Sequence, residues 1–247
     1  MPERLLRKLL EHADFLERGM PLLRLLVQDP AMRGPLTALG ADASSTVARV
    51  TTLPFTSPAL IPQLKLTAVL LRAEPPGSGA IHTFLPWAFR TLQSASAAAD
   101  AEESDAPHLL RVAQLALATT LDVCSAPGAT AAAAVLRCKK HANAVLRGFR
   151  VRGGSETLLA TLVLVAALMA EDSTSCSQML DDDVIPALLL LLRKPFAPLC
   201  EALTHQLDWC APATATLSAL SLCSPSCMLL HLLLSTKSAR GARRIKK

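Results

Sequence analysis

The stretch from Met179 to Pro195 reads MLDDDVIPALLLLLRKP, and it joins three aspartates to an apolar run with a proline near its start. Proline fixes φ near the helical value and lacks an N–H, so it is tolerated in the first turn of a helix. Acidic side chains just before that turn favour the positive end of the helix dipole. The stretch therefore predicts a polar break ending at Asp183 and a helix that begins near Pro186.

Two other segments share this layout: GMPLLRLLV (Gly19 to Val27) and TFLPWAFRTL (Thr83 to Leu92). Pro21 and Pro86 would then mark two more helix starts. Segments 112–138 and 215–234 follow the same layout without the proline anchor. The predicted helix starts, near residues 21, 86, 135, 186 and 226, lie roughly 40 to 65 residues apart. The first interval is the longest, which predicts an extra helix or loop within residues 29–62.

This pattern resembles the armadillo repeat family, whose units of about 40–47 residues contain two or three helices. The resemblance is clearest over residues 157–234, where ATLVLVAALMAEDSTSCSQMLDDDVIPALLLLL gives a second helix, a polar break, a proline step and a long third helix. It implies a short right-handed α-solenoid of about four to five armadillo-like or HEAT-like repeats over residues 1–236. An irregular helical bundle is the alternative fold.

The composition independently favours an all-α protein. Leu and Ala dominate, and both are strong helix formers, whereas aromatic residues are only 3% of the chain and Tyr is absent. A β-sandwich or barrel would normally contain more β-branched and aromatic residues. The seven cysteines form no even framework in this large apolar chain. They predict free, mostly buried thiols and an intracellular protein, cytoplasmic or nuclear.

Three segments interrupt the helical pattern: AEPPGSGA (73–80), SASAAADAEESDAP (94–107) and FRVRGGSE (149–156). The second is rich in Ser and Ala, and its acidic residues are not balanced by any base, so we expect a flexible insert. The longest apolar run, Thr157 to Ala170, is shorter than the ~20 residues that cross a bilayer. We expect it to form a buried core helix, with no membrane span.

The net charge of +5 depends on the last residues of the chain. The tail 237–247, KSARGARRIKK, carries six basic residues and no acid: Lys237, Arg240, Arg243, Arg244, Lys246 and Lys247. A solvated tail is one interpretation. The other is a nuclear-targeting or polyanion-binding arm, through which the chain would contact nucleic acid.

Motifs that carry chemistry are absent from the sequence. It contains no phosphate-binding, dinucleotide-binding, HExxH or GxSxG motif, so we expect a protein that is not an enzyme and uses no cofactor. Cys223, Cys227 and His231 have a spacing that could hold zinc, but an ordinary helix with buried thiols is favoured. Cys138 and His141 are a weaker pair. Asp181 to Asp183 are best explained as acids at a helix start.

The predicted site is a surface. In armadillo arrays the third helices line a concave groove that binds extended peptides, so the resemblance implies a groove containing Arg24, Trp87, Arg90, Arg193, Lys194 and His231. An exposed tryptophan beside arginine suits a peptide or acidic segment, while a buried Trp87 is the alternative. The predicted function is a scaffold or adaptor that binds protein partners, alone or within a larger complex. The alternative is an RNA-associated or ribonucleoprotein-associated repeat protein that uses the basic tail.

Overall fold

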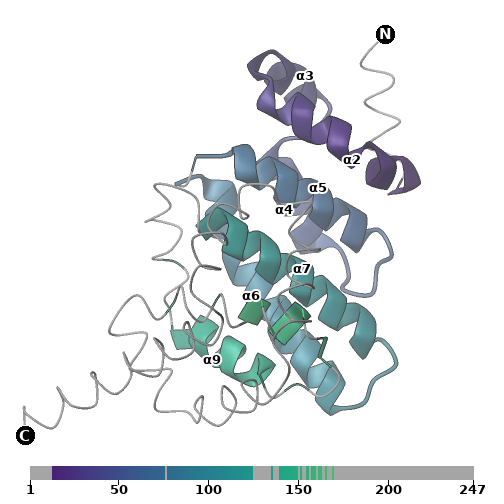
Figure 1. Ribbon diagram of the computed structural model, residues 1–247, viewed down its shortest axis with the longest axis vertical. Helices are drawn as coiled ribbons and strands as arrows, with labels where there is room; N and C mark the ends of the chain where they lie inside the picture. The colour runs from purple at the N-terminus through teal and green to yellow at the C-terminus, as the bar shows by residue number, and fades with distance from the viewer. Residues whose placement is uncertain are drawn as a thin grey trace, which may run out of the picture.

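Helices account for every regular element in the part of the chain that the structure describes. The computed structural model describes residues 13–75, 77–124, 135, 139–149, 151, 154–155, 157–159, 161–162, 165 and 169. The elements are α2 (Ala13–Gln28), the 3-10 helix η1 (Pro30–Met32), α3 (Arg33–Ala38), α4 (Ala43–Thr52), α5 (Leu60–Ala73), α6 (Gly79–Asp100), α7 (Ala106–Cys124) and α9 (Lys139–Gly148) (Figure 1). No strand occurs among these residues, which confirms the predicted all-α class for them.

Two helical hairpins form the centre of the described chain. Residues 53–59 join α4 to α5, and residues 101–105 join α6 to α7. Within each pair the helices pack against each other. Arg49, late in α4, donates from Nη1 to Oε1 of Gln63, early in α5, at 3.4 Å. Short connections of this kind place consecutive helices antiparallel.

The hairpins stack with like helix against like helix: α4 packs on α6, and α5 packs on α7. Arg72, in the last turn of α5, donates to the carboxylate of Asp122 near the end of α7 at 2.8 Å, so these two helices end side by side. α2 packs against α5, and α9 packs against α6. The described helices thus form two layers, with α4, α6 and α9 in one and α2, α5 and α7 in the other (Figure 1).

Two of the prolines that were expected to begin helices, Pro21 and Pro86, lie inside them. α6 begins well before Pro86, with Ser78 as its N-cap, whose hydroxyl accepts from the Ile81 N–H at 3.4 Å. Apolar side chains on both sides of this proline, from Ile81 to Leu92, are buried in one core. Their packing outweighs the cost of about 3 kcal/mol for an interior proline. Pro21 likewise lies inside α2, so both predicted helix starts are corrected.

Most of the segment 94–107 is helical. Ser94 to Asp100 form the end of α6, and α7 begins at Ala106, so the connection is only the turn 101–105. Ala is the strongest helix former. Small side chains of this segment are buried under the neighbouring helices: Ala95, Ser96, Ala98 and Ala99. The expected insert is therefore corrected to a short turn, because the composition that favoured disorder instead allows close helix packing.

The other predicted breaks agree with the structure. α5 ends at Ala73 and α6 begins at Gly79, within the predicted loop 73–80. The long interval 29–62 contains η1, α3 and α4, as the repeat spacing required. α9 ends at Gly148, at the edge of the third predicted loop.

The described part of the run Thr157 to Ala170 is a buried helix, as expected. Ser155 caps it: its hydroxyl accepts from the Leu158 N–H and donates to Oε1 of Gln114 in α7, both at 3.1 Å. Four of its apolar side chains are fully buried: Leu158, Leu162, Val165 and Met169. A Cβ at Gly148 would lie 3.1 Å from both methyl groups of Leu162, so the glycine lets α9 end close to this helix.

Candidate interaction surface

Trp87, which was expected in the binding groove, is a core residue. Its side chain is 2% exposed. The centroid of its ring system lies 5.6 Å from that of Phe84 and 6.2 Å from that of Phe55. Because Phe55 belongs to the connection between α4 and α5, these aromatic side chains hold that connection against α6. The expectation of a partner-contacting Trp87 is corrected, and its alternative, a buried tryptophan, agrees with the structure.

Arg90 lies one turn after Trp87 and is exposed. α6 packs against α4, α7 and α9, which leaves one narrow strip of the helix open to solvent. Arg90 belongs to that strip together with His82 and Thr83. Arg24 lies in α2, in the other layer. The structure therefore does not place Arg24 and Arg90 in one row of helices.

The remaining residues predicted for the surface lie outside the described residues. These are Arg193, Lys194, His231 and the basic residues of the tail, Lys237, Arg240, Arg243, Arg244, Lys246 and Lys247. The same holds for Asp181 to Asp183, for Pro186, and for the cysteines of the candidate zinc site, Cys223 and Cys227.

The helices α6 and α9 expose basic side chains and almost no acidic ones. Arg90 on α6 and Lys140 and Arg147 on α9 are exposed. α9 contains no acid, and the one acid of α6 is its last residue, Asp100. Since α9 packs against α6, the three basic side chains lie on the same layer, and we call them the basic face. α4, beside α6 in this layer, adds an exposed Arg49 and again no acid.

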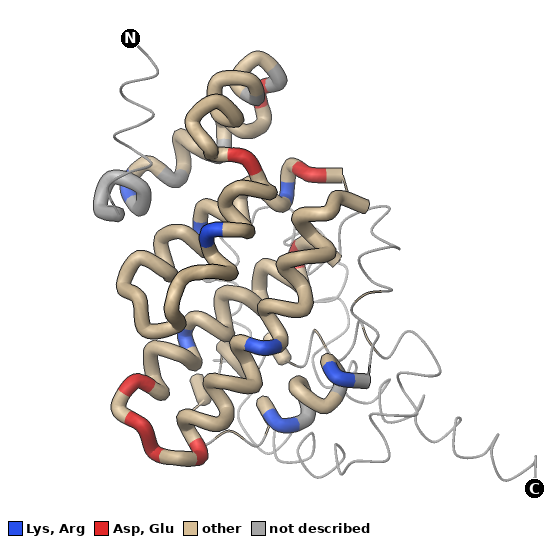
Figure 2. Tube along the Cα trace, turned by 180° about the vertical axis from the view of Figure 1, so that it is seen from behind, with Lys and Arg blue, Asp and Glu red and all other residues tan. Residues whose placement is uncertain are grey.

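Acidic side chains gather instead at the turn between α6 and α7. Asp100, Glu102 and Glu103 are exposed, and Asp105 is half-buried. Figure 2 shows these acids together at one end of the molecule, away from the basic positions along the helices. Within the described residues no group of three or more His, Cys, Asp or Glu side chains could hold a metal ion. The charge is thus separated along the layer, with basic helices and an acidic turn.

His141 joins α9 to α6. Its imidazole stacks on the ring of Phe89, with 4.1 Å between centroids and 15° between planes, and the residue is buried. Its sequence partner in the weak metal candidate, Cys138, lies outside the described residues. Cys124, at the end of α7, is buried and has a thiol that is not in a disulfide, as predicted for the cysteines of this chain.

Sequence reasoning missed the basic face, although its signal was present. The segments that form α6 and α9 carry basic residues and no acid before Asp100, so a charge count for each helix would have found it. The ion pair of Arg72 with Asp122 had no such signal, because its residues belong to different hairpins. Only the stacking of α5 on α7 brings them together.

Comparison with known proteins gives this chain no relative. No protein-family model matches it, and neither a curated protein nor a solved structure does. Across the described helices, none has the length and apolar character needed to cross a membrane.

Proposed function

We propose that the protein is a non-enzymatic scaffold or adaptor, built as a right-handed α-solenoid of armadillo or HEAT type, that binds a protein partner. The observation that carries this proposal is the stacking of two hairpins, with α4 on α6 and α5 on α7. In repeat proteins each unit contacts its neighbours, and the stack presents an extended surface to partners. In stacked repeats, the equivalent helices of successive hairpins run in the same direction and end side by side. The ion pair between Arg72 and Asp122, which joins the ends of α5 and α7, is consistent with such stacking.

The chemistry of the basic face favours an acidic segment as the partner's contact. Arg90 and Arg147 offer planar guanidinium groups, which pair with carboxylates through two parallel hydrogen bonds. Complementary charge also speeds encounter and selects against basic partners. Trp87 is buried and contributes to the fold of this layer by packing against Phe55 of the α4–α5 connection.

Charge reversal tests this proposal. We expect Arg90→Glu with Arg147→Glu to remove partners recovered by affinity purification and quantitative mass spectrometry, while Arg111→Glu retains them. Arg111 is also exposed but lies on α7, in the other layer, so it controls for the change of net charge. An acidic peptide from a recovered partner should lose at least about tenfold in affinity, or 1.4 kcal/mol, in the reversed variant. Equal partner loss in both variants would contradict a role for the basic face.

The basic tail favours a second candidate, an RNA-associated or ribonucleoprotein-associated protein. Its six basic residues are uncompensated within 237–247, and phosphate contacts of this kind give an affinity that falls steeply with salt. Filter binding to single-stranded RNA, with and without residues 237–247, separates the candidates. RNA binding that disappears with the tail supports the second candidate. Absent or tail-independent binding removes it.

A further inference from the structure

Helix α2 turns two leucines towards solvent. Leu22 is 44% exposed and Leu25 is 66% exposed, and no other large hydrophobic side chain of the described residues is exposed. On the other side of the same helix, Leu23 and Val27 are buried against the core. α2 is therefore apolar on two sides, although a helix at the edge of a layer needs only one apolar side. The side that carries Leu22 and Leu25 is therefore a candidate contact surface for a partner.

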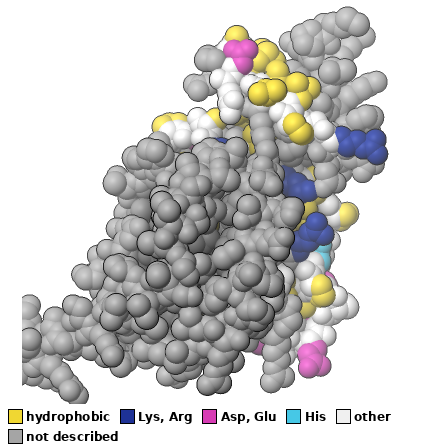
Figure 3. All heavy atoms as spheres, in the orientation of Figure 1, with side chains coloured by type: hydrophobic (Ala, Val, Ile, Leu, Met, Phe, Trp, Pro, Cys, Tyr) yellow, Lys and Arg dark blue, Asp and Glu magenta, His cyan; other side chains and the backbone are white. Residues whose placement is uncertain are grey.

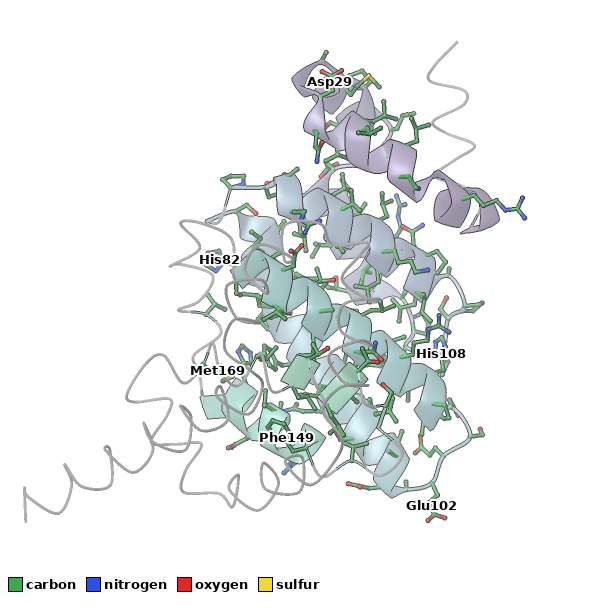
Figure 4. The ribbon with its side chains drawn as sticks, viewed as in Figure 1. Asp29, His82, Glu102, His108, Phe149 and Met169 are labelled. Carbon is green, nitrogen blue, oxygen red and sulfur yellow. The ribbon has the colours of Figure 1, made fainter. Side chains whose placement is uncertain are left out.

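Charged residues of opposite sign flank the two leucines. Arg18 is exposed near the start of α2, and Asp29 is exposed just beyond its end. Figure 3 shows hydrophobic side chains over α2 and α3 between an acidic side chain at one end and a basic one at the other, and Figure 4 labels Asp29 at the acidic end. The positions 18, 22 and 25 are four and three residues apart, which places them in one row along α2. Asp29 follows four residues after Leu25, just beyond the end of the helix, and extends the row.

This row is symmetric about its centre. Reversed end to end, the spacing remains four, three and four, the leucines exchange places, and Arg18 exchanges with Asp29. In a two-fold interface residue i of one copy contacts residue j of the other, and j contacts i. A row with this symmetry is therefore complementary to a second, antiparallel copy of itself.

We propose that α2 is the contact of a homodimer, in which it packs antiparallel against α2 of a second copy of this chain. Leu22 of each protomer then lies against Leu25 of the other, around a two-fold axis between residues 23 and 24. Arg18 of each protomer pairs with Asp29 of the other, at the two ends of a row roughly 16 Å long. The inference is independent of the proposed partner-binding function, because the row lies on α2 and the basic face on α6 and α9.

The contact is small, so the dimer is weak. Stable interfaces bury about 1,200–2,000 Å² in total, which is more than the roughly three helical turns of this row supply from each copy. Each exposed ion pair adds little to the affinity and is screened by salt. We therefore expect a dimer that dissociates on dilution and weakens as salt is raised.

Asp29 has a local role that the test must respect. Its Oδ1 accepts from the Ala31 N–H at 2.9 Å and so caps η1. Asp29→Asn can keep this acceptor while removing the charge, and it serves as the mild variant. Asp29→Arg is the stronger variant, and its helix content must match that of the wild type by circular dichroism.

Sedimentation equilibrium of the full chain over a range of concentrations tests the interface. The wild type should show a monomer–dimer equilibrium. The double variant Leu22→Gln with Leu25→Gln should raise the dissociation constant of the dimer at least about tenfold. Arg18→Glu and Asp29→Asn should each weaken it, the first more strongly, whereas Arg111→Glu should leave it unchanged. A wild type that stays monomeric at every concentration overturns the proposal and leaves the leucines to a different partner. A dimer that persists in the leucine variant overturns it as well.

Mixing two variants gives the decisive measurement. Arg18→Glu alone places two acids opposite each other, and Asp29→Arg alone places two bases opposite each other. In a one-to-one mixture, a heterodimer regains both opposite-charge pairs. We expect the mixture to dimerise more tightly than either variant does alone. A mixture that behaves as the sum of its parts, with both variants folded, overturns the antiparallel pairing.

Discussion

The guanidinium of Arg72 lies 2.8 Å from the carboxylate of Asp122 and joins the ends of α5 and α7. The side chain of Asp122 is 5% exposed and that of Arg72 is 23% exposed, so the pair sits at the boundary between the core and solvent. A charge removed from water must be compensated by a partner. Arg72 meets this requirement from the neighbouring hairpin, and the pair therefore helps to set how the two hairpins align.

We expect Arg72→Met to lower the free energy of unfolding by about 2 kcal/mol, because it takes the guanidinium from a buried carboxylate. The value is below that for fully buried pairs, since Arg72 is partly exposed. Urea denaturation followed by circular dichroism measures it. Adding Asp122→Leu to Arg72→Met should recover most of the loss, because the buried charge is then gone. A double variant that is no more stable than Arg72→Met would contradict this account.

Trp87 and Arg90, one turn apart on α6, should behave oppositely. Trp87→Ala removes a buried aromatic side chain and should lower the free energy of unfolding by about 3–5 kcal/mol. Arg90→Ala changes an exposed side chain and should stay within about 0.5 kcal/mol of the wild type. Thermal and urea unfolding measure both. Trp87→Phe keeps an aromatic ring beside Phe55 and Phe84, so its free energy of unfolding should lie between those of Trp87→Ala and Arg90→Ala. A Trp87→Ala variant with the stability of the wild type would argue against the buried position of Trp87.

The sequence predicted the all-α class and several breaks because these depend on local chemistry. Ser78 and the Pro–Gly-rich residues around it interrupt two helices whatever the remaining chain does. The helix start predicted at Pro86 was wrong because the effect of this proline depends on packing far along the chain. Residues on both sides of it, including Ile81 and Leu92, pack into one core, and this packing keeps the helix continuous across Pro86. The Ala-rich end of α6 was predicted wrongly as a flexible insert for the same reason, because its small side chains are held in place by packing against α7.

The candidate surface was predictable only in part. Arg90 is exposed as expected, because an arginine in an apolar helix is placed by its own charge. Whether Trp87 faces solvent or core depends on Phe55, which comes from another hairpin and carries no sequence signal of that contact. The exposed row on α2 was also hidden, because Leu22 and Leu25 look like core residues until Leu23 and Val27 are seen to fill the core side.

Asp42 makes the stability of α4 depend on pH. It is the N-cap of α4, and its carboxylate accepts from the Ser45 N–H at 2.9 Å and from the Ser45 hydroxyl at 2.6 Å. Partial burial raises the pKa of Asp42, but these hydrogen bonds and further backbone bonds lower it more, so its pKa lies below the ordinary value of 3.8. A lowered folded-state pKa means stability that is present above the ordinary value and lost as pH falls through the folded value.

We expect Asp42→Ala to lower the free energy of unfolding by about 1 kcal/mol near neutral pH, as loss of an N-cap does. Asp42→Asn keeps an acceptor for the Ser45 N–H and should lose less. The difference in unfolding free energy between the wild type and either variant should become smaller as the pH falls below the ordinary pKa of an aspartate. Urea unfolding at about pH 7 and about pH 3 measures it. A gap of constant size would show that the charge of Asp42 contributes nothing.

α3 and α6 end with the same backbone geometry but with different residues. After α3, Gly40 has φ of 65°, and after α6, Glu102 has φ of 56°. At each end two N–H groups bond back into the last turn: Gly40 to Thr37 O and Ala41 to Leu36 O, both at 2.9 Å, and Glu102 to Ala99 O at 3.3 Å and Glu103 to Ala98 O at 3.0 Å. This helix ending favours glycine at the left-handed position, so Glu102 holds a strained conformation that Gly40 adopts freely.

Exchanging the residue types at these two positions should therefore change stability in opposite directions. Glu102→Gly should raise the free energy of unfolding by about 1 kcal/mol, because the left-handed conformation costs a residue with a Cβ roughly 1–2 kcal/mol and glycine returns part of that in entropy. Gly40→Ala should lower it by about 1 kcal/mol, although its new Cβ would meet only the Arg49 side chain at 3.8 Å, so the loss comes from φ alone. Glu103→Gly is the matched control, since it also removes an acid from the turn but not a positive φ. If Glu103→Gly stabilises the protein as much as Glu102→Gly, the gain comes from relieved charge repulsion and the strain at Glu102 is negligible.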